Sequence, residues 1–162
     1  MTVAFSLAFA RGGRAPAHNF AVCQQHHPDN FWNPAWQRHA NGVTAVGGVV
    51  MVADNPSDHH IFLSAFAGER ELLSSSAGIT VATPRGDIQA VTPAAYFDLF
   101  GLAPPDISGG GRLAALRLRS SDMNATQASL SSGQFSPIRH MGRLVVPPDQ
   151  ALGAALVFEA AD

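Results

Sequence analysis

Lysine is absent from this sequence, and charged residues of either sign are few. All ten basic residues are arginines, charged residues make up 14% of the chain, and the formal net charge is −2. The arginines are dispersed, so no basic cluster offers the electrostatic footprint that binds nucleic acid. Hydrophobic residues make up 46% of the chain, which is enough for a packed core. We therefore expect one domain, or two small repeats, without a nucleic-acid partner.

Cysteine and long apolar runs are also scarce. Cys23 is the only cysteine, which excludes an internal disulfide and fits a reducing compartment. No run approaches the ~20 apolar residues of a membrane span. No basic residue precedes the apolar start of the chain, as one would in a signal peptide. We expect a soluble, cytoplasmic protein without a membrane partner. Cys23 lies in a predicted strand, where we expect a buried packing residue rather than a nucleophile.

The sequence does contain one polar and aromatic segment, Cys23 to Gly42, CQQHHPDNFWNPAWQRHANG. It holds both tryptophans and three of the seven histidines. Such a segment is costly to bury unless its polar groups find partners, so it is typical of a stretch that lines or closes a cleft. Pro28 and Pro34 prevent one continuous helix here but permit short helical turns.

Two strands are predicted at the N-terminal side of this segment, and the second of them overlaps its first residues. Apolar residues alternate with small ones from Val3 to Phe9, which is the period of a strand. A turn-rich connection containing Gly12 and Gly13 then leads to a second strand over 19–25. The pattern predicts a β-hairpin over residues 3–25.

The rest of the chain repeats one pattern. A strand leads to a helix that begins at an acidic or amide cap (Asp54 or Asn55, then Asp122) and ends at a glycine (Gly68, then Gly133). Three further strands follow in each unit. The predicted strands are 46–53, 70–75, 78–83, 87–92, 112–121, 137–140, 142–146 and 154–160, and a short helix over 93–100 joins the units.

The connections within each unit are too short for a parallel doubly wound sheet, so we expect each run of three strands to be antiparallel. The repeat divides the chain into four parts. We predict terminal strands and a His/Trp-rich connection over 1–42, a first βαβββ module over 43–101, a linker over 102–111 and a second module over 112–162.

Two βαβββ units in tandem resemble the vicinal oxygen chelate superfamily, which includes glyoxalases, extradiol dioxygenases and bleomycin-resistance proteins. The segments CQQHHPDNFW…QRHANG and GGVVMVADNPSDHH are similar to the bacterial glyoxalase-like domain proteins. The resemblance implies an α+β fold in which tandem βαβββ modules form a curved, mixed or antiparallel sheet. It also implies that residues 3–25 are the last strands of a preceding module. The chain would then be part of a longer protein, or would complete its sheet as a homodimer.

The resemblance further implies where a divalent metal would bind, with a histidine on the first strand of a unit and a glutamate on the last. The corresponding first-strand positions hold Gly47 and Ala115, and the last-strand positions hold Gln89 and Glu159. Glycine and alanine have no donor atom, and glutamine is a poor ligand. Only Glu159 keeps a usable donor, so the usual metal-dependent mechanism is not expected and we assign no metal ligand. The alternative is a divalent cofactor, which would be zinc, nickel, manganese or iron.

The histidines offer a different site. His26, His39 and Glu159 would make a set of two histidines and one carboxylate, which suits a divalent ion. His26 and His27 are adjacent, so on a strand they point to opposite faces and cannot share an ion. The alternative is that these histidines bond to backbone or face solvent. We name Glu159 and His26 as the candidate catalytic residues.

Trp32 and Trp36 are spaced four apart and form a candidate aromatic face. They either plug the apolar end of the sheet or form the wall of a ligand pocket. Arg38 beside them is either a surface charge or a bidentate partner for a carboxylate. The candidate ligand-binding residues are Gln25, His27, Trp32, Trp36, Arg38 and His39.

Three functions remain open. The first is an enzyme of lyase, isomerase or dioxygenase type that acts on small oxygenated or carboxylate substrates. The second is a metal-free module that sequesters an aromatic or apolar small molecule. The third is a structural half that exists to dimerise. The sequence predicts a glyoxalase-like protein that acts on or binds a small molecule by a reaction it does not specify.

Overall fold

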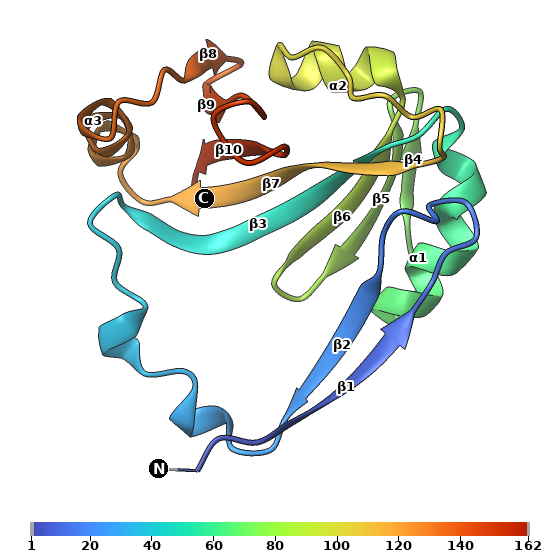
Figure 1. The fold of residues 1–162 in the computed structure, drawn as a ribbon, viewed down its shortest axis with the longest axis horizontal. Coiled ribbons are helices and arrows are strands. Elements are labelled where there is room, and N and C mark those ends of the chain that lie inside the picture. The colour runs from blue at the N-terminus through green and yellow to red at the C-terminus, as the bar shows by residue number, and fades with distance from the viewer. Residues whose placement is uncertain (1, 162) are drawn as a thin grey trace.

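The computed structural model describes residues 2–161. Its centre is an eight-stranded mixed sheet with the strand order β4-β5-β6-β3-β7-β10-β9-β8. Figure 1 shows this sheet as a curved layer, with α1 and α3 at its two ends, α2 above it and a separate hairpin below it. No described helix has the length and apolarity needed to cross a membrane.

Each half of the sheet comes from one stretch of chain. The first half contains β3 (Val43–Val52), a 3₁₀ turn (Pro56–His59), α1 (His60–Ala67), β4 (Leu73–Ser75), β5 (Gly78–Thr83) and β6 (Gly86–Val91). Helix α2 (Pro93–Phe100) follows. The second half contains β7 (Arg112–Ser120), α3 (Met123–Ser132), β8 (Ile138–His140), β9 (Arg143–Val146) and β10 (Ala155–Ala160).

The pairing of the strands is the same in both halves. The first and last strands of each half are parallel neighbours, β3 with β6 and β7 with β10. The other strands pair antiparallel, β4 with β5, β5 with β6, β8 with β9 and β9 with β10. The predicted α+β class, with tandem βαβββ modules in a curved sheet, is confirmed. The exact boundaries at 42, 101 and 111 stay a prediction.

The two halves meet where β3 pairs antiparallel with β7. This ladder is irregular, because its register shifts between Val43 and Ala45, between Val46 and Gly48, and between Val50 and Met51. Each shift places an extra residue on β3 or β7, and such bulges bend a strand and increase its twist.

Local sequence explains where the helices begin and end. Asp122 accepts hydrogen bonds from the backbone of Asn124 and Ala125, and so caps α3. Thr92 caps α2, and Pro93 occupies its first turn. Gly101 ends α2 in the left-handed conformation, with φ 68°, which costs glycine little.

Hydrophobic side chains form a core on both faces of the sheet. On one face Met51 and Val81 pack with Leu63 of α1, and Leu144 and Phe158 pack beneath α3. The opposite face, which we call the inner face, carries α2. There the neighbouring residues of the same strands pack against Tyr96 and Phe100.

The N-terminal hairpin is a separate two-stranded sheet of β1 (Phe5–Ala10) and β2 (Phe20–Gln25). It is anchored to α1 by Phe20, whose ring centroid lies 4.9 Å from that of Phe62 and 5.2 Å from that of Phe66. The hairpin was predicted, but the expectation that Cys23 is buried was wrong. Cys23 is exposed, because only the end of β2 next to Phe20 reaches the core.

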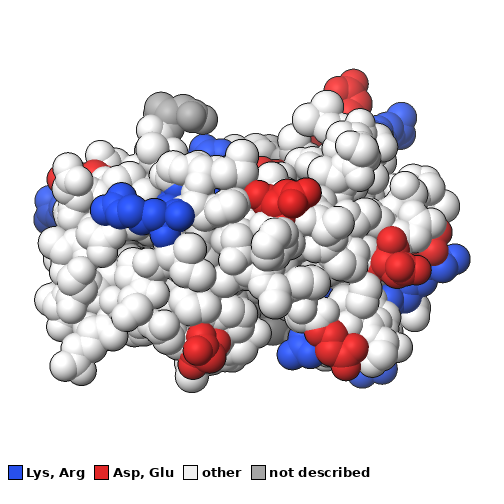
Figure 2. Space-filling view, turned by 90° about the horizontal axis from the view of Figure 1, so that it is seen from above, with Lys and Arg blue, Asp and Glu red and all other residues white. Residues whose placement is uncertain are grey.

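Two further details differ from the sequence-based expectations. The strand predicted from residue 70 begins at Leu73, because the preceding Glu69, Arg70 and Glu71 stay outside the ladder. The surface is sparsely charged, as the composition requires. Figure 2 shows one face on which basic and acidic side chains form small, separate groups on a mostly uncharged surface.

Candidate functional site

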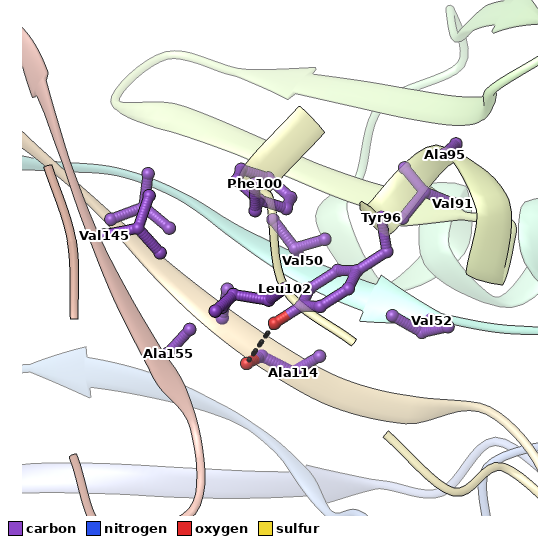
Figure 3. Packing of buried hydrophobic residues seen from close by; sticks show 12 residues of the cluster. Val50, Val52, Val91, Ala95, Tyr96, Phe100, Leu102, Ala114, Val145 and Ala155 are labelled. Atoms are coloured by element: carbon purple, nitrogen blue, oxygen red, sulfur yellow. Dashed lines mark hydrogen bonds between the residues drawn. The ribbon is translucent and has the colours of Figure 1, made fainter. Parts of the chain in front are cut away.

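The inner face of the sheet has an apolar end and a polar end. At the apolar end, Val50, Val52, Val91 and Val157 surround Tyr96 and Phe100, which are 1% and 2% exposed. The Tyr96 hydroxyl donates a 3.4 Å hydrogen bond to the carbonyl of Ala114 (Figure 3). Helix α2 therefore fills this end of the face with its own side chains.

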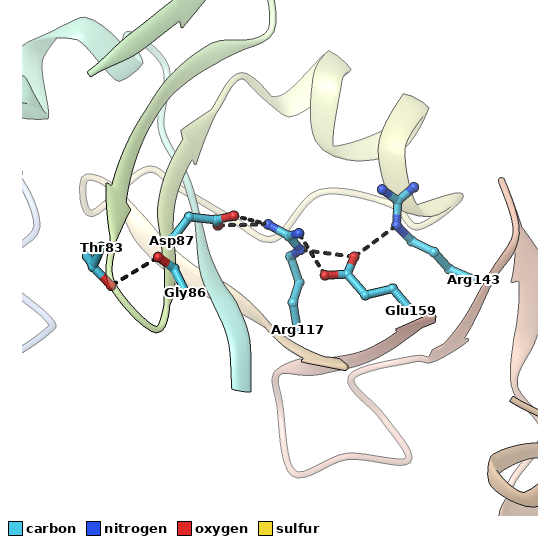
Figure 4. Close-up of polar contacts among 6 residues, drawn as sticks. All are labelled: Thr83, Gly86, Asp87, Arg117, Arg143 and Glu159. Atoms are coloured by element: carbon cyan, nitrogen blue, oxygen red, sulfur yellow. Dashed lines mark hydrogen bonds and ion pairs between the residues drawn. The ribbon is translucent and has the colours of Figure 1, made fainter. Parts of the chain in front are cut away.

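The polar end lies further along the same strands. Arg117 of β7 lies between Asp87 of β6 and Glu159 of β10 (Figure 4). Its Nη1 donates to both carboxylate oxygens of Asp87 at 2.7 and 2.8 Å. Its Nη2 and Nε donate to Glu159 at 2.7 and 3.3 Å. One guanidinium thus joins carboxylates from the two halves of the sheet.

This ion cluster is largely shielded from solvent. The side chains of Arg117, Glu159 and Asp87 are 13%, 15% and 20% exposed. Burial by itself lowers the pKa of Arg117, but the hydrogen bonds and negative charges of Glu159 and Asp87 outweigh it and raise that pKa. The guanidinium therefore stays charged. Its two carboxylate partners are the groups that offset the cost of burying that charge.

Two more arginines extend the polar end. Arg143 of β9 places its Nε 3.4 Å from Glu159, and Figure 4 shows its terminal nitrogens pointing away from that carboxylate. Arg119 lies two residues after Arg117 on β7 and forms no side-chain ion pair or hydrogen bond with any of residues 2–161. A pocket of about 350 Å³ is lined by Arg117, Arg119, Met141, Gly142, Arg143, Glu159 and Ala160.

A glycine on the neighbouring strand makes room for this arrangement. A Cβ atom at Gly47 would lie 2.9 Å from the Glu159 carboxylate and 3.2 Å from the Arg119 side chain. The family resemblance marks two of these residues as metal positions: Gly47 on the first strand of the first half and Glu159 on the last strand of the second half. The structure places them next to each other. Ala115 is buried in the apolar core, away from the exposed part of the pocket.

These residues do not fit a divalent metal. Both oxygens of Glu159 and both oxygens of Asp87 accept hydrogen bonds from Arg117, which already supplies the positive charge. No set of three His, Cys, Asp or Glu residues within 2–161 is grouped so as to hold an ion. Among these residues, the structure does not group His26 and His39 with Glu159 as a possible metal site. Glu159 instead contacts Arg117 and Arg143.

The other predicted site residues lie on the surface. His26 follows β2, is exposed, and its Nε2 lies 2.8 Å from the Ser6 hydroxyl. Trp32 and Trp36 are 54% and 62% exposed. They lie on either side of Asn33, with Trp36 ending a second 3₁₀ turn, Pro34–Trp36. His27, Arg38 and His39 are exposed and Gln25 is half-buried.

Sequence reasoning missed Asp87, Arg117, Arg119 and Arg143. A signal for them was present, because charged residues follow apolar ones at a period of two. In β7, Arg117 and Arg119 continue the face of buried Ala115, with Leu116 and Leu118 between them on the other face. In β9 and β10, Arg143 precedes Val145 and Glu159 follows Val157 by the same step.

Comparisons with known proteins bear on the fold. No protein-family model matches this sequence, and no curated protein matches it. Among solved structures, methylmalonyl-CoA epimerase from Mycobacterium tuberculosis is similar, with a TM-score of 0.55 and 16% identity over 80% of this chain and 96% of that one. A selenomethionine methylmalonyl-CoA epimerase has a TM-score of 0.51 and 12% identity over 74% of this chain and 97% of that one.

A hypothetical protein from Bacillus halodurans is also similar, with a TM-score of 0.51 and 12% identity over 72% of this chain and 94% of that one. At these identities the likeness concerns the fold. It is the glyoxalase-like fold of the vicinal oxygen chelate superfamily, to which the sequence pattern pointed.

Proposed function

We propose that this chain binds a small carboxylate at the polar end of the inner face, without using a metal. The observation that carries this proposal is the pocket itself, in which three arginines face one carboxylate, Glu159. Arg117 is fully paired by Asp87 and Glu159. The donors left for a ligand are those of Arg119 and Arg143.

Guanidinium groups suit a carboxylate ligand for two reasons. Their planar arrangement of N–H donors matches the two oxygens of a carboxylate, so the contact can be bidentate. The pocket is also partly shielded, since the Arg143 side chain is only 25% exposed. A charge pair is stronger there than in bulk water, because the surrounding medium is less polarisable.

The rim of the pocket suggests what else the ligand carries. Met141 is 67% exposed and lines the pocket beside Gly142. A thioether packs well against apolar groups of varied shape. We infer a ligand with a carboxylate head for Arg119 and Arg143 and a short apolar body for Met141. The epimerases of the same fold act, by their name, on methylmalonyl-CoA, which is also anionic and supports a small-molecule role for this fold.

We assign Glu159 a positioning role in this function. Its carboxylate accepts hydrogen bonds from Arg117 and contacts Arg143, so it holds both guanidinium groups in place. The earlier candidate His26 has no part in this site. The alternative of an apolar ligand in a tryptophan-lined cup has less support, because Trp32 and Trp36 are exposed on the surface.

A cytoplasmic location and a homodimer also belong to this proposal. Cys23 is exposed and unpaired, which fits a reducing compartment.

Calorimetric titration with sodium acetate, benzoate, succinate and phosphate tests the ligand class. We expect benzoate, which has an apolar body, to bind more tightly than acetate. The double variant Arg119→Gln/Arg143→Gln should weaken binding at least tenfold, which corresponds to about 1.4 kcal/mol. Arg70→Gln is the matched control, because it removes an exposed arginine at the end of α1. Absence of binding by all four anions, or equal weakening in the control, would contradict the proposed function.

A further inference from the structure

The edges of the two sheets differ in how they are protected. The main sheet ends in β4 and β8, and each of these edge strands has only three residues. Arg139 lies within β8, and Glu69, Arg70 and Glu71 lie just before β4. Short strands and nearby charges are the usual means by which a protein prevents its sheet edges from pairing with another chain.

The hairpin has less of this protection, with one charged residue, Arg11, directly after β1. Both β1 and β2 are six residues long, and neither contains a charged residue or a proline. In Figure 1, β2 lies on the side toward the main sheet and β1 on the outside of the molecule. No strand within residues 2–161 pairs with the outer edge of β1. A long, uncharged, exposed edge of this kind is a template for a further strand.

The backbone of β1 shows which residues form this edge. The amide of His26 donates to the carbonyl of Ala4 at 2.9 Å, so Ala4 is directed toward β2. In an antiparallel ladder alternate residues direct both polar groups to the same partner. Ser6, Ala8 and Ala10 therefore bond to β2. The N–H and C=O groups of Phe5, Leu7 and Phe9 point to the open edge.

The same residues carry an exposed apolar face. Phe5, Leu7 and Phe9 are 55%, 47% and 72% exposed. The two phenylalanines alone present about 250 Å² of surface, taking about 200 Å² for each ring side chain. An interface of standard size takes about 800 Å² from each partner, and smaller ones are weak, so we expect a weak dimer. Val3, which is 49% exposed, and the backbone strip add to the aromatic contribution.

We propose that β1 pairs antiparallel with β1 of a second copy of this chain, with Leu7 at the twofold axis. Leu7 then faces Leu7 of the second copy, and Phe5 faces Phe9. Every open N–H and C=O of these residues gains a partner, and aromatic side chains lie opposite each other on one face. Because the strand has no charge, self-pairing brings no like charges together. The two hairpins form one four-stranded sheet with a closed, isologous interface.

Light scattering coupled to size-exclusion chromatography, from about 1 to about 100 μM protein, tests this pairing. We expect the wild-type chain to shift from monomer to dimer in this range. Leu7→Pro removes an N–H at the open edge and leaves the bonds between β1 and β2 intact, so it should weaken dimerisation at least tenfold. Leu7→Ile keeps both the N–H and the apolar side chain, and is expected to dimerise like the wild type.

A second variant guards against a folding defect in the proline variant. Leu7→Lys keeps the N–H but places two like charges opposite each other at the axis, so it should also give monomers. Circular dichroism and thermal unfolding establish that each variant is folded. A wild-type monomer at the highest concentration, or a dimer that survives both Leu7→Pro and Leu7→Lys, overturns the pairing. The pairing is also overturned if the wild-type chain forms aggregates and the two variants form them to the same extent. Carboxylate binding is expected to persist in both variants, so failure of this pairing would remove the proposed dimer but leave the proposed carboxylate binding unaffected.

Discussion

The two ends of the inner face are built from the same strands but organised by different forces. At the apolar end, α2 supplies Tyr96 and Phe100, which pack in a cluster of hydrophobic side chains. At the polar end, Arg117 needs Asp87 and Glu159 to remain buried. Hydrophobic packing alone stabilises the apolar end. The polar end is stable only while each member of the charged cluster keeps its partner.

This difference separates stability from recognition within a single surface. Apolar burial is non-directional and tolerates no ligand once the space is filled. The hydrogen bonds of a charged cluster are directional. Here Arg119 and Arg143 still have N–H groups that can bind a ligand. Substitutions at the apolar end should therefore affect folding, whereas those at the pocket should affect binding.

The largest effect is expected at the apolar end. Phe100→Ala removes a side chain that is 2% exposed and leaves a cavity between α2 and the sheet. The free energy of unfolding should fall by about 3–5 kcal/mol, measured by urea denaturation. Benzoate affinity of the folded fraction should remain near the wild-type value. A loss of stability under about 1 kcal/mol would mean that α2 is not a true part of the core.

Breaking the ion cluster should cost somewhat less. Arg117→Met keeps a long side chain but leaves Asp87 and Glu159 facing each other without a cation, so we expect a loss of about 3 kcal/mol near neutral pH. Arg143→Met is the matched control and should cost under about 1 kcal/mol, since Glu159 keeps Arg117. Equal losses in both variants would show that Arg117 has no special place in the cluster.

The smallest effect concerns a histidine outside both ends. Burial lowers the pKa of His59, Arg14 lowers it further, and Asp58 partly opposes them. Above about pH 6.5 His59 is neutral in both the folded and the unfolded chain, so it does not affect stability. As the pH falls below that value, the unfolded chain binds a proton that the folded chain does not, and stability declines toward the lowered pKa.

Thermal unfolding between about pH 7.5 and about pH 5 should reveal this decline, and His59→Gln should make the curve flatter. An unchanged curve would show that His59 does not contribute to the acid sensitivity.

The fold could be inferred from sequence because its signals are local. Asp122 and Gly68 mark the start of α3 and the end of α1, and Gly68 has the left-handed φ of 74° that favours glycine. Turn residues and strand alternation then give the order of elements, and the repeat gives the architecture. The strand predicted at 70–75 was too long, because charged residues before Leu73 remain outside the ladder.

The candidate site could not be inferred in the same way, because its members are brought together by strand pairing. Arg117 is 30 residues from Asp87 and 42 from Glu159 along the chain. The dense segment of histidines and tryptophans was predicted to line a site, yet that segment lies on the surface. The alternation in β7 was visible, but only the order of strands in the sheet shows which charges meet.

The irregular ladder between β3 and β7 has a geometric consequence for the pocket. A flat sheet would set Arg119, Arg143 and Glu159 on an open plane, where water would surround each of them. Three changes of register along the central seam bend the layer instead. The arginines thus lie on the inner face of a curved layer rather than on an open plane. Deleting one extra residue of β3 should shift the register of the strand beyond it and turn its side chains to the other face.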